Sequence, residues 1–216
     1  MKKLYAFLIM SICCLDVCGQ GQFKNHFKFG FKLGLGINTI TGSAVKAFPR
    51  AGLMIGGLWF QIKMSKNWTM QTELIYSYKG NGTYNPNHPK NGDYLLQLSY
   101  YEVPILFQYN KKKAYFEFGV GLATLSGAGE VIIGGVLPYN PDYYTFSKRD
   151  FTFNIGTGYV FNEKWRTGLR LINSLIPVRK QLPKASMPGY NIGLVFSVSR
   201  QLNLKASRNK QSEDGQ

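Results

Sequence analysis

The segment from Phe27 to Ile37 reads FKFGFKLGLGI, and large apolar residues alternate with lysine or glycine along its whole length. Successive side chains of a β-strand point to opposite faces. One face of this strand therefore carries only apolar side chains, namely Phe27, Phe29, Phe31, Leu33, Leu35 and Ile37. Such a strand suits a wall between lipid and a narrow polar interior. A soluble β-sandwich would usually place polar residues on the outside.

Seven further segments follow a similar pattern. They are Gly52 to Met64, Trp68 to Lys79, Tyr94 to Tyr109, Ala114 to Leu125, Arg149 to Phe161, a segment that begins at Trp165, and Tyr190 to Ser199. In the first of these both faces are apolar, and we expect Leu58, Phe60, Ile62 and Met64 to face outward.

The connections between the eight segments alternate in length. Three are tight, Ser65 to Asn67, Asn110 to Lys113 and Asn162 to Lys164, and four are long, Asn38 to Arg50, Gly80 to Asp93, Ser126 to Lys148 and Ser174 to Gly189. An even strand number with short turns at one end is typical of outer-membrane barrels, in which the short turns are periplasmic. The sequence therefore predicts an all-β fold, an eight-stranded antiparallel transmembrane β-barrel of the outer-membrane type.

The first nineteen residues have the features of a secretory signal, with Lys2 and Lys3 ahead of the apolar run Leu4 to Leu15. We expect cleavage before Gln20. The predicted organisation is a signal peptide over residues 1–19, one barrel domain over 20–199 and a polar C-terminal tail over 200–216. Export with this strand pattern predicts the bacterial outer membrane as the location.

All three cysteines lie inside that leader, as Cys13, Cys14 and Cys18. Cleavage would leave a chain that forms no disulfide, which suits any redox compartment. A lipoprotein would need a small residue just before Cys18, and the chain has Val17 there, which favours cleavage over lipidation.

The composition bounds the possible partners. Removal of Lys2, Lys3 and Asp16 from 26 basic and 11 acidic residues leaves 24 and 10, a formal charge of +14. An exported protein rarely meets nucleic acid, so we expect no nucleic-acid partner. The nearer anionic partners are outer-membrane lipid and lipopolysaccharide. No later segment has the roughly 18 consecutive apolar residues of a membrane helix.

Charged residues recur on the predicted inner face of the strands. They are Lys28, Lys32, Glu73, Glu102, Glu117, Arg166 and Arg170, with Gln71 and Gln108 beside them. Buried charges must be paired or solvated, and an eight-stranded barrel is only wide enough for its own side chains. The sequence therefore predicts an internal network that plugs the lumen, with Glu102 among Arg166, Arg170, Lys28 or Lys32. A proton or small-ion path is the alternative.

Catalysis has little support in the sequence. The chain has two histidines, His26 and His88, and His88 has Asp93 and Ser99 within a dozen residues. Some eight-stranded barrels are lipid-modifying enzymes that combine histidine, serine and a carboxylate, but proximity in sequence does not establish a triad. We therefore expect no enzyme and no catalytic, cofactor-binding or metal-binding residues. A lipid-modifying enzyme that uses His88 is kept as the alternative.

The longest predicted connection, Ser126 to Lys148, is unusually apolar. Its candidate partner-binding residues are Val131, Ile132, Ile133, Tyr139, Tyr143 and Tyr144. Exposed apolar surface of this kind is typical of a contact site or of a lid over the barrel mouth.

Four stretches carry a family resemblance. They are Phe29 to Asn38 (FGFKLGLGIN), Trp68 to Gly80 (WTMQTELIYSYKG), Ser99 to Tyr109 (SYYEVPILFQY) and Phe118 to Ala123 (FGVGLA). Together they resemble the PorT-like outer-membrane β-barrel family of Bacteroidetes. The most specific piece is Tyr101-Glu102-Val103-Pro104, because proline inside a spanning strand is otherwise unexpected.

The resemblance implies eight antiparallel strands. It also implies a non-enzymatic protein with a structural or protein-partner role, since some members support protein secretion across the outer membrane. A small-solute pore is a further alternative. One departure is the polar segment Arg200 to Gln216, because barrels of this kind usually end on an aromatic residue of the last strand.

Overall fold

The computed structural model describes residues 27–41, 48–82, 93–133, 146–179 and 188–202. The predicted signal peptide, most of the predicted tail, both histidines, and Tyr139, Tyr143 and Tyr144 lie outside these described residues. The strands are β1 (Phe27–Ile40), β2 (Phe48–Lys63), β3 (Trp68–Gly82), β4 (Asp93–Lys111), β5 (Ala114–Ile133), β6 (Arg149–Val160), β7 (Trp165–Ser174) and β8 (Asn191–Leu202).

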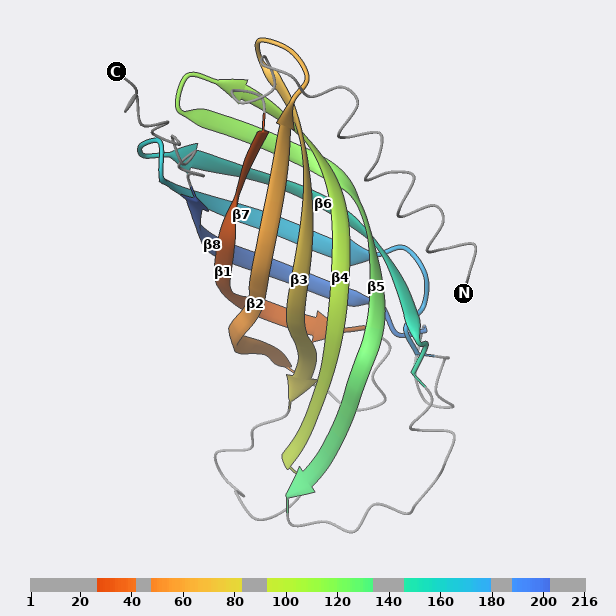
Figure 1. Ribbon diagram of the computed structural model, residues 1–216. Coiled ribbons are helices and arrows are strands. Elements are labelled where there is room, and N and C mark those ends of the chain that lie inside the picture. The colour runs from red at the N-terminus through yellow and green to blue at the C-terminus, as the bar shows by residue number, and fades with distance from the viewer. Residues whose placement is uncertain (1–26, 42–47, 83–92, 134–145, 180–187, 203–216) are drawn as a thin grey trace, which may run out of the picture.

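The eight strands form one closed barrel (Figure 1). Each strand pairs antiparallel with its neighbours in sequence, and β8 pairs back onto β1 from Phe29↔Leu202 to Ile40↔Asn191. Closure leaves the barrel wall without an open sheet edge in lipid, which is the condition for a sheet to span a membrane. The predicted fold class is confirmed.

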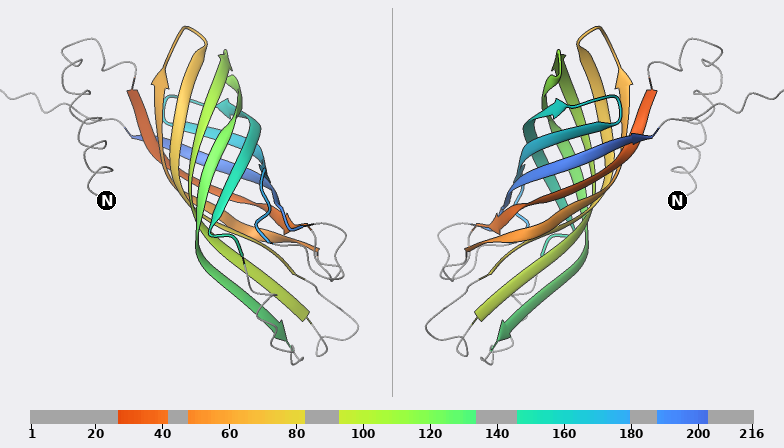
Figure 2. Two further views of the ribbon diagram at one scale, coloured as in Figure 1. Left: turned by 90° about the vertical axis from the view of Figure 1, so that its right-hand side faces the viewer. Right: turned by 90° about the vertical axis from the view of Figure 1, so that its left-hand side faces the viewer.

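The three short turns lie at one end of the barrel, together with the start of β1 and the end of β8 (Figures 1 and 2). Each turn is tight: Met64 N donates to Trp68 O at 2.9 Å and Phe161 N donates to Trp165 O at 3.1 Å. In the β4–β5 turn, Lys112 takes a positive φ of 55°. Short turns of outer-membrane barrels are periplasmic, so we refer to this end as the periplasmic end.

The wall alternates as the sequence predicts. In β1, Lys32 and Asn38 are buried in the lumen, while Leu33 and Leu35 are 55% and 58% exposed on the outside. The outward orientation expected for Leu58, Phe60, Ile62 and Met64 is also confirmed. Because both faces of β2 are apolar, its pattern did not reveal that Trp59 is turned into the lumen, where it is only 1% exposed.

Aromatic side chains cluster on the outer face toward both ends of the wall. Near the periplasmic turns the Trp68 and Tyr109 rings lie 5.2 Å apart between centroids. Toward the other end, Tyr76 lies 5.2 Å from Tyr78 and 5.1 Å from Tyr101. Aromatic belts of this kind mark the two interfaces of a membrane.

The strands β4 and β5 are longer than their neighbours and project past the rim opposite the periplasmic end (Figures 1 and 2). Their ladder runs out to Asp93↔Ile133, whereas the β5–β6 ladder ends at Thr124↔Arg149. The prediction of a loop from Ser126 onward was therefore wrong for its first part. Val131, Ile132 and Ile133 belong to β5, because β-branched residues favour strands and the ladder pairs these three residues with Leu95, Tyr94 and Asp93 of β4.

Candidate functional site

A cluster of four charges fills the lumen on the periplasmic side of its middle; we call it the central cluster, and it consists of Lys32, Glu73, Glu117 and Arg170. Arg170 Nη1 lies 2.8 Å from Glu73 Oε2, and its Nε donates to Glu117 Oε1 at 2.7 Å. Lys32 forms an ion pair with Glu73. Two cations and two carboxylates neutralise one another, and all four are buried. The sequence predicted all four as inward charges.

Amide side chains extend the central cluster toward the periplasmic end. Gln108 Nε2 donates to Glu117 Oε2 at 2.9 Å and to Gln71 Oε1 at 3.2 Å. Gln61 Nε2 in turn donates to Gln108 Oε1 at 2.6 Å. Buried amides satisfied in this way lock the side chains of several strands to one another.

Arg166 lies at the periplasmic edge of these amides. Its Nη2 donates to Gln71 Oε1 at 2.8 Å, and its guanidinium carbon lies 3.7 Å from the centroid of the Trp59 ring. Trp59 is itself fixed, because its Nε1 donates to Phe31 O at 3.2 Å. A cation over an indole face is attracted by the ring quadrupole.

A second group of charges lies toward the long connections; we call it the outer cluster, and it consists of Lys79, Glu102 and Asp150. Lys79 Nζ lies 2.8 Å from Glu102 Oε1 and 3.6 Å from Asp150 Oδ2. Asp150 Oδ2 also accepts from Ser174 Oγ at 2.9 Å and from Asn191 Nδ2 at 3.0 Å.

The structure corrects two of the sequence predictions about inward charges. Glu102 faces the lumen as expected, but its cation is Lys79 and not Arg166, Arg170, Lys28 or Lys32. The reason is the stagger of tilted strands, which puts inward residues of different strands at different depths. Lys28 is exposed at the periplasmic end and forms no ion pair with any described residue.

Lys79 and Asp150 were not predicted as members of a charge cluster. Lys79 was recognised as inward-facing but stood at the end of its predicted strand. Asp150 shares its parity with the inward Thr152 and Asn154 at the start of β6, and that parity was the available signal.

Apolar side chains separate and cap the two clusters. Along β3, Ile75 lies between Glu73 and Ser77, and along β7, Ile172 lies between Arg170 and Ser174. These isoleucines pack with Ile55 and Val195 to form an apolar layer across the lumen. Beyond the outer cluster a second apolar group, Ile40, Leu96, Leu98, Tyr100, Ala123 and Val178, caps the lumen.

Little space remains inside this part of the lumen. A cavity of about 10 Å³ lies between the apolar layer and the outer cluster, among Ile55, Ser77, Lys79 and Glu102. That volume matches a single water molecule. Within the described residues, the side chains occlude the barrel.

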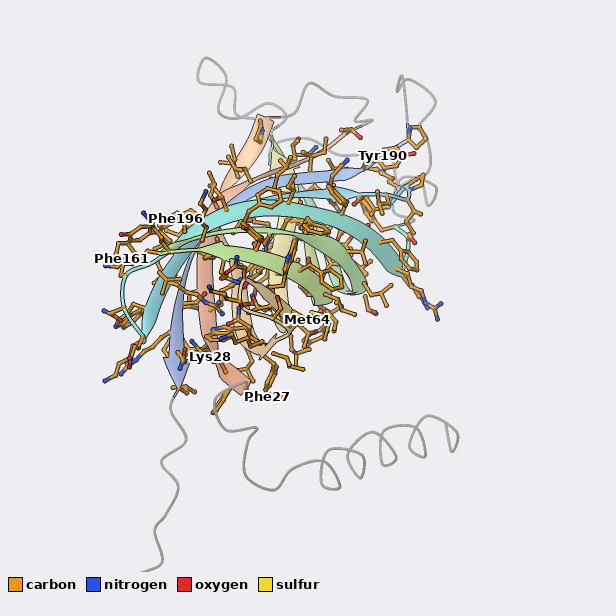
Figure 3. All side chains as sticks on the ribbon, turned by 90° about the horizontal axis from the view of Figure 1, so that it is seen from above. Phe27, Lys28, Met64, Phe161, Tyr190 and Phe196 are labelled. Carbon is orange, nitrogen blue, oxygen red and sulfur yellow. The ribbon has the colours of Figure 1, made fainter. Side chains whose placement is uncertain are left out.

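A larger cavity, about 240 Å³, opens at the periplasmic end. Its lining combines basic, amide and aromatic side chains from every described strand except β5 and from the β2–β3 and β6–β7 turns. Figure 3 labels Phe27 and Lys28, with which β1 begins at this end.

The described residues contain no group of three or more His, Cys, Asp or Glu side chains that could hold a metal ion. In the same part of the chain, no helix is long and apolar enough to cross a membrane.

A family model identifies the chain at the level of the domain. The model for the outer membrane protein beta-barrel domain matches residues 10–171. The chain belongs to this family. With the closed barrel and its apolar outer wall, this family makes the protein an outer-membrane β-barrel protein. No curated protein matches the sequence.

Several solved outer-membrane barrels are similar in structure at low sequence identity. Ail, the attachment invasion locus protein of Yersinia pestis, is 6% identical with a TM-score of 0.45, over 82% of this chain and 99% of that one. Neisserial surface protein A is 10% identical with a TM-score of 0.46, over 82% and 97%. The outer membrane enzyme PagL is 15% identical with a TM-score of 0.40, over 77% and 97%.

Proposed function

We propose that this protein is a non-enzymatic, integral outer-membrane barrel that binds a protein partner through the projecting end of β4 and β5. The observation that carries the proposal is the length of these two strands, whose ladder extends nine residues of β5 past Thr124, from Leu125 to Ile133. A barrel that only sealed itself in the membrane would not need such an extension.

The projecting part of β5 has an open edge among the described residues. One side of it pairs with β4 out to Asp93↔Ile133. On the other side, the described backbone contact is from Leu125 N to Lys148 O at 2.9 Å. Residues 126–129 are exposed. An open strand edge offers backbone donors and acceptors to an extended segment of another chain.

The filled lumen supports a role at the surface of the barrel over a role as a pore. The central cluster, the apolar layer and the outer cluster follow one another along the lumen, and the cavity between the layer and the outer cluster has the size of one water molecule. A solute would have to displace paired buried charges to pass, which costs several kcal/mol.

We also propose that the protein is a PorT-like member of this family. This affiliation is supported by Tyr101-Glu102-Val103-Pro104, in which Pro104 lies inside a spanning strand and its carbonyl accepts from Thr72 Oγ1 at 3.2 Å. A role accessory to protein secretion follows from that affiliation, with the projecting strands as the part that contacts the secreted protein or its machinery.

The test is site-specific photo-crosslinking in intact cells. A photo-reactive amino acid at Gly127, on the exposed edge, should capture a discrete protein. The matched control carries the same photo-reactive amino acid in place of Pro177, which is also exposed but belongs to the β7–β8 connection. Deletion of Gly129 to Tyr144 should abolish the effect that depends on the protein partner and leave the barrel folded. Equal labelling at both sites, or unchanged function after the deletion, would refute the proposal.

A further inference from the structure

The cavity at the periplasmic end has a strongly basic lining. Its ionisable side chains comprise five cations and one carboxylate, namely Lys28, Lys63, Lys66, Lys164, Arg166 and Glu163, which gives a formal charge of +4. Gln61, Thr69, Asn110, Asn162 and Gln201 add further polar groups to the lining. A concave surface of one sign of charge concentrates ligands of the opposite sign.

These cations are not neutralised by the described part of the chain. None of the four lysines has a carboxylate within ion-pair distance there. The central cluster cannot supply one, because Glu73 and Glu117 are already matched by Lys32 and Arg170.

Arg166 is the decisive residue. It is 9% exposed, lines the cavity, and has Gln71 as its hydrogen-bond acceptor and the Trp59 ring as its other contact. The buried cations Lys32, Lys79 and Arg170 each contact a carboxylate, and Arg166 does not. A buried guanidinium without an anion is costly, and its remaining N–H groups suit bidentate binding of an oxyanion.

We propose that this cavity is a binding site for a phosphate-bearing anion, with Arg166 as the anchoring residue and Lys28, Lys63, Lys66 and Lys164 around it. The volume of about 240 Å³ is below the roughly 300–1,000 Å³ of sites that enclose drug-sized ligands, which favours a small anion or a single head group. The phosphate comes either from a soluble periplasmic anion or from a phospholipid head group of the inner leaflet.

The full-length protein in zwitterionic nanodiscs should bind pyrophosphate saturably in isothermal titration calorimetry at constant ionic strength. Arg166→Gln should weaken binding by at least about tenfold, the usual effect of losing a charged hydrogen bond. A Lys28→Gln/Lys63→Gln double variant should also weaken pyrophosphate binding. Both lysines are exposed, so this variant does not disturb the buried amides. Lys111→Gln is the matched control, because Lys111 is an exposed lysine at the same end outside the cavity lining.

Nanodiscs that contain phosphatidylglycerol distinguish the two sources. If this lipid competes with pyrophosphate in the wild-type protein and the competition is lost in the double variant, the site binds a head group. If the lipid leaves pyrophosphate binding unchanged, the site binds a soluble anion. The proposal is overturned by the absence of saturable binding in both kinds of nanodisc. It is equally overturned if Lys111→Gln weakens binding as much as the cavity variants, because that result would mean a diffuse attraction to basic surface.

Discussion

Lys79 of β3 and Glu102 of β4 form a buried ion pair of 2.8 Å that is separated from the central cluster by an apolar layer. The lumen is therefore organised in depth: polar and apolar side chains alternate from the periplasmic cavity to the outer cap. This order explains why the inward charges form two independent networks. Each network can be tested separately.

Replacement of Glu102 by alanine should destabilise the barrel. The substitution leaves Lys79 with Asp150 at 3.6 Å as its remaining carboxylate, and breaking a buried pair costs on the order of 3–5 kcal/mol. We expect the lower end of that range in the free energy of unfolding, measured by urea titration in detergent or lipid. The control is Glu163→Ala, whose carboxylate is exposed in the β6–β7 turn. Equal stability of the two variants would contradict the buried pair.

Glu73→Gln should destabilise the barrel more than Glu102→Gln. Glu73 contacts both Lys32 and Arg170, so its neutralisation leaves two buried cations with one remaining carboxylate, Glu117. A double-mutant cycle with Lys32→Met and Glu73→Gln should give a coupling free energy of about 1–3 kcal/mol. A coupling near zero would mean that water in the lumen screens the pair.

The face of each charged residue could be predicted from sequence, and its partner could not. Alternation with period two is a local property, and it turned Lys32, Glu73, Glu102, Glu117 and Arg170 inward as the structure has them. Pairing depends on the tilt and stagger of neighbouring strands, which no short stretch of sequence encodes. Glu102 was for this reason assigned to the wrong cations.

Residues at the strand ends were the other source of error. Lys28 has inward parity but lies where the barrel opens to water, so parity alone could not predict that it is exposed. The extension of β5 to Ile133 was missed because the small residues Gly127-Ala128-Gly129 interrupt the alternation after Leu125. In the structure, pairing with β4 carries the strand through this interruption.

His88→Ala tests the enzymatic alternative. His88 lies outside the described residues, so the hypothesis that it is catalytic rests on the sequence alone. We expect the profile of lipopolysaccharide and phospholipid species, measured by mass spectrometry of isolated outer membranes, to be identical with and without the substitution. A species that disappears in the variant and returns with the unmodified protein would refute the proposal of a non-enzymatic protein.

The wild-type barrel should show no steady conductance in planar lipid bilayers. A water-filled path would have to pass the layer of Ile55, Ile75, Ile172 and Val195, and apolar constrictions of this kind exclude ions by dewetting. Replacing Ile75 and Ile172 with serine should admit water and raise the conductance measurably, while Leu74→Ser and Leu171→Ser, on the lipid-facing side of the same strands, should not. Large stable channels in the wild-type protein would show that the lumen is open and that the charges line a pore.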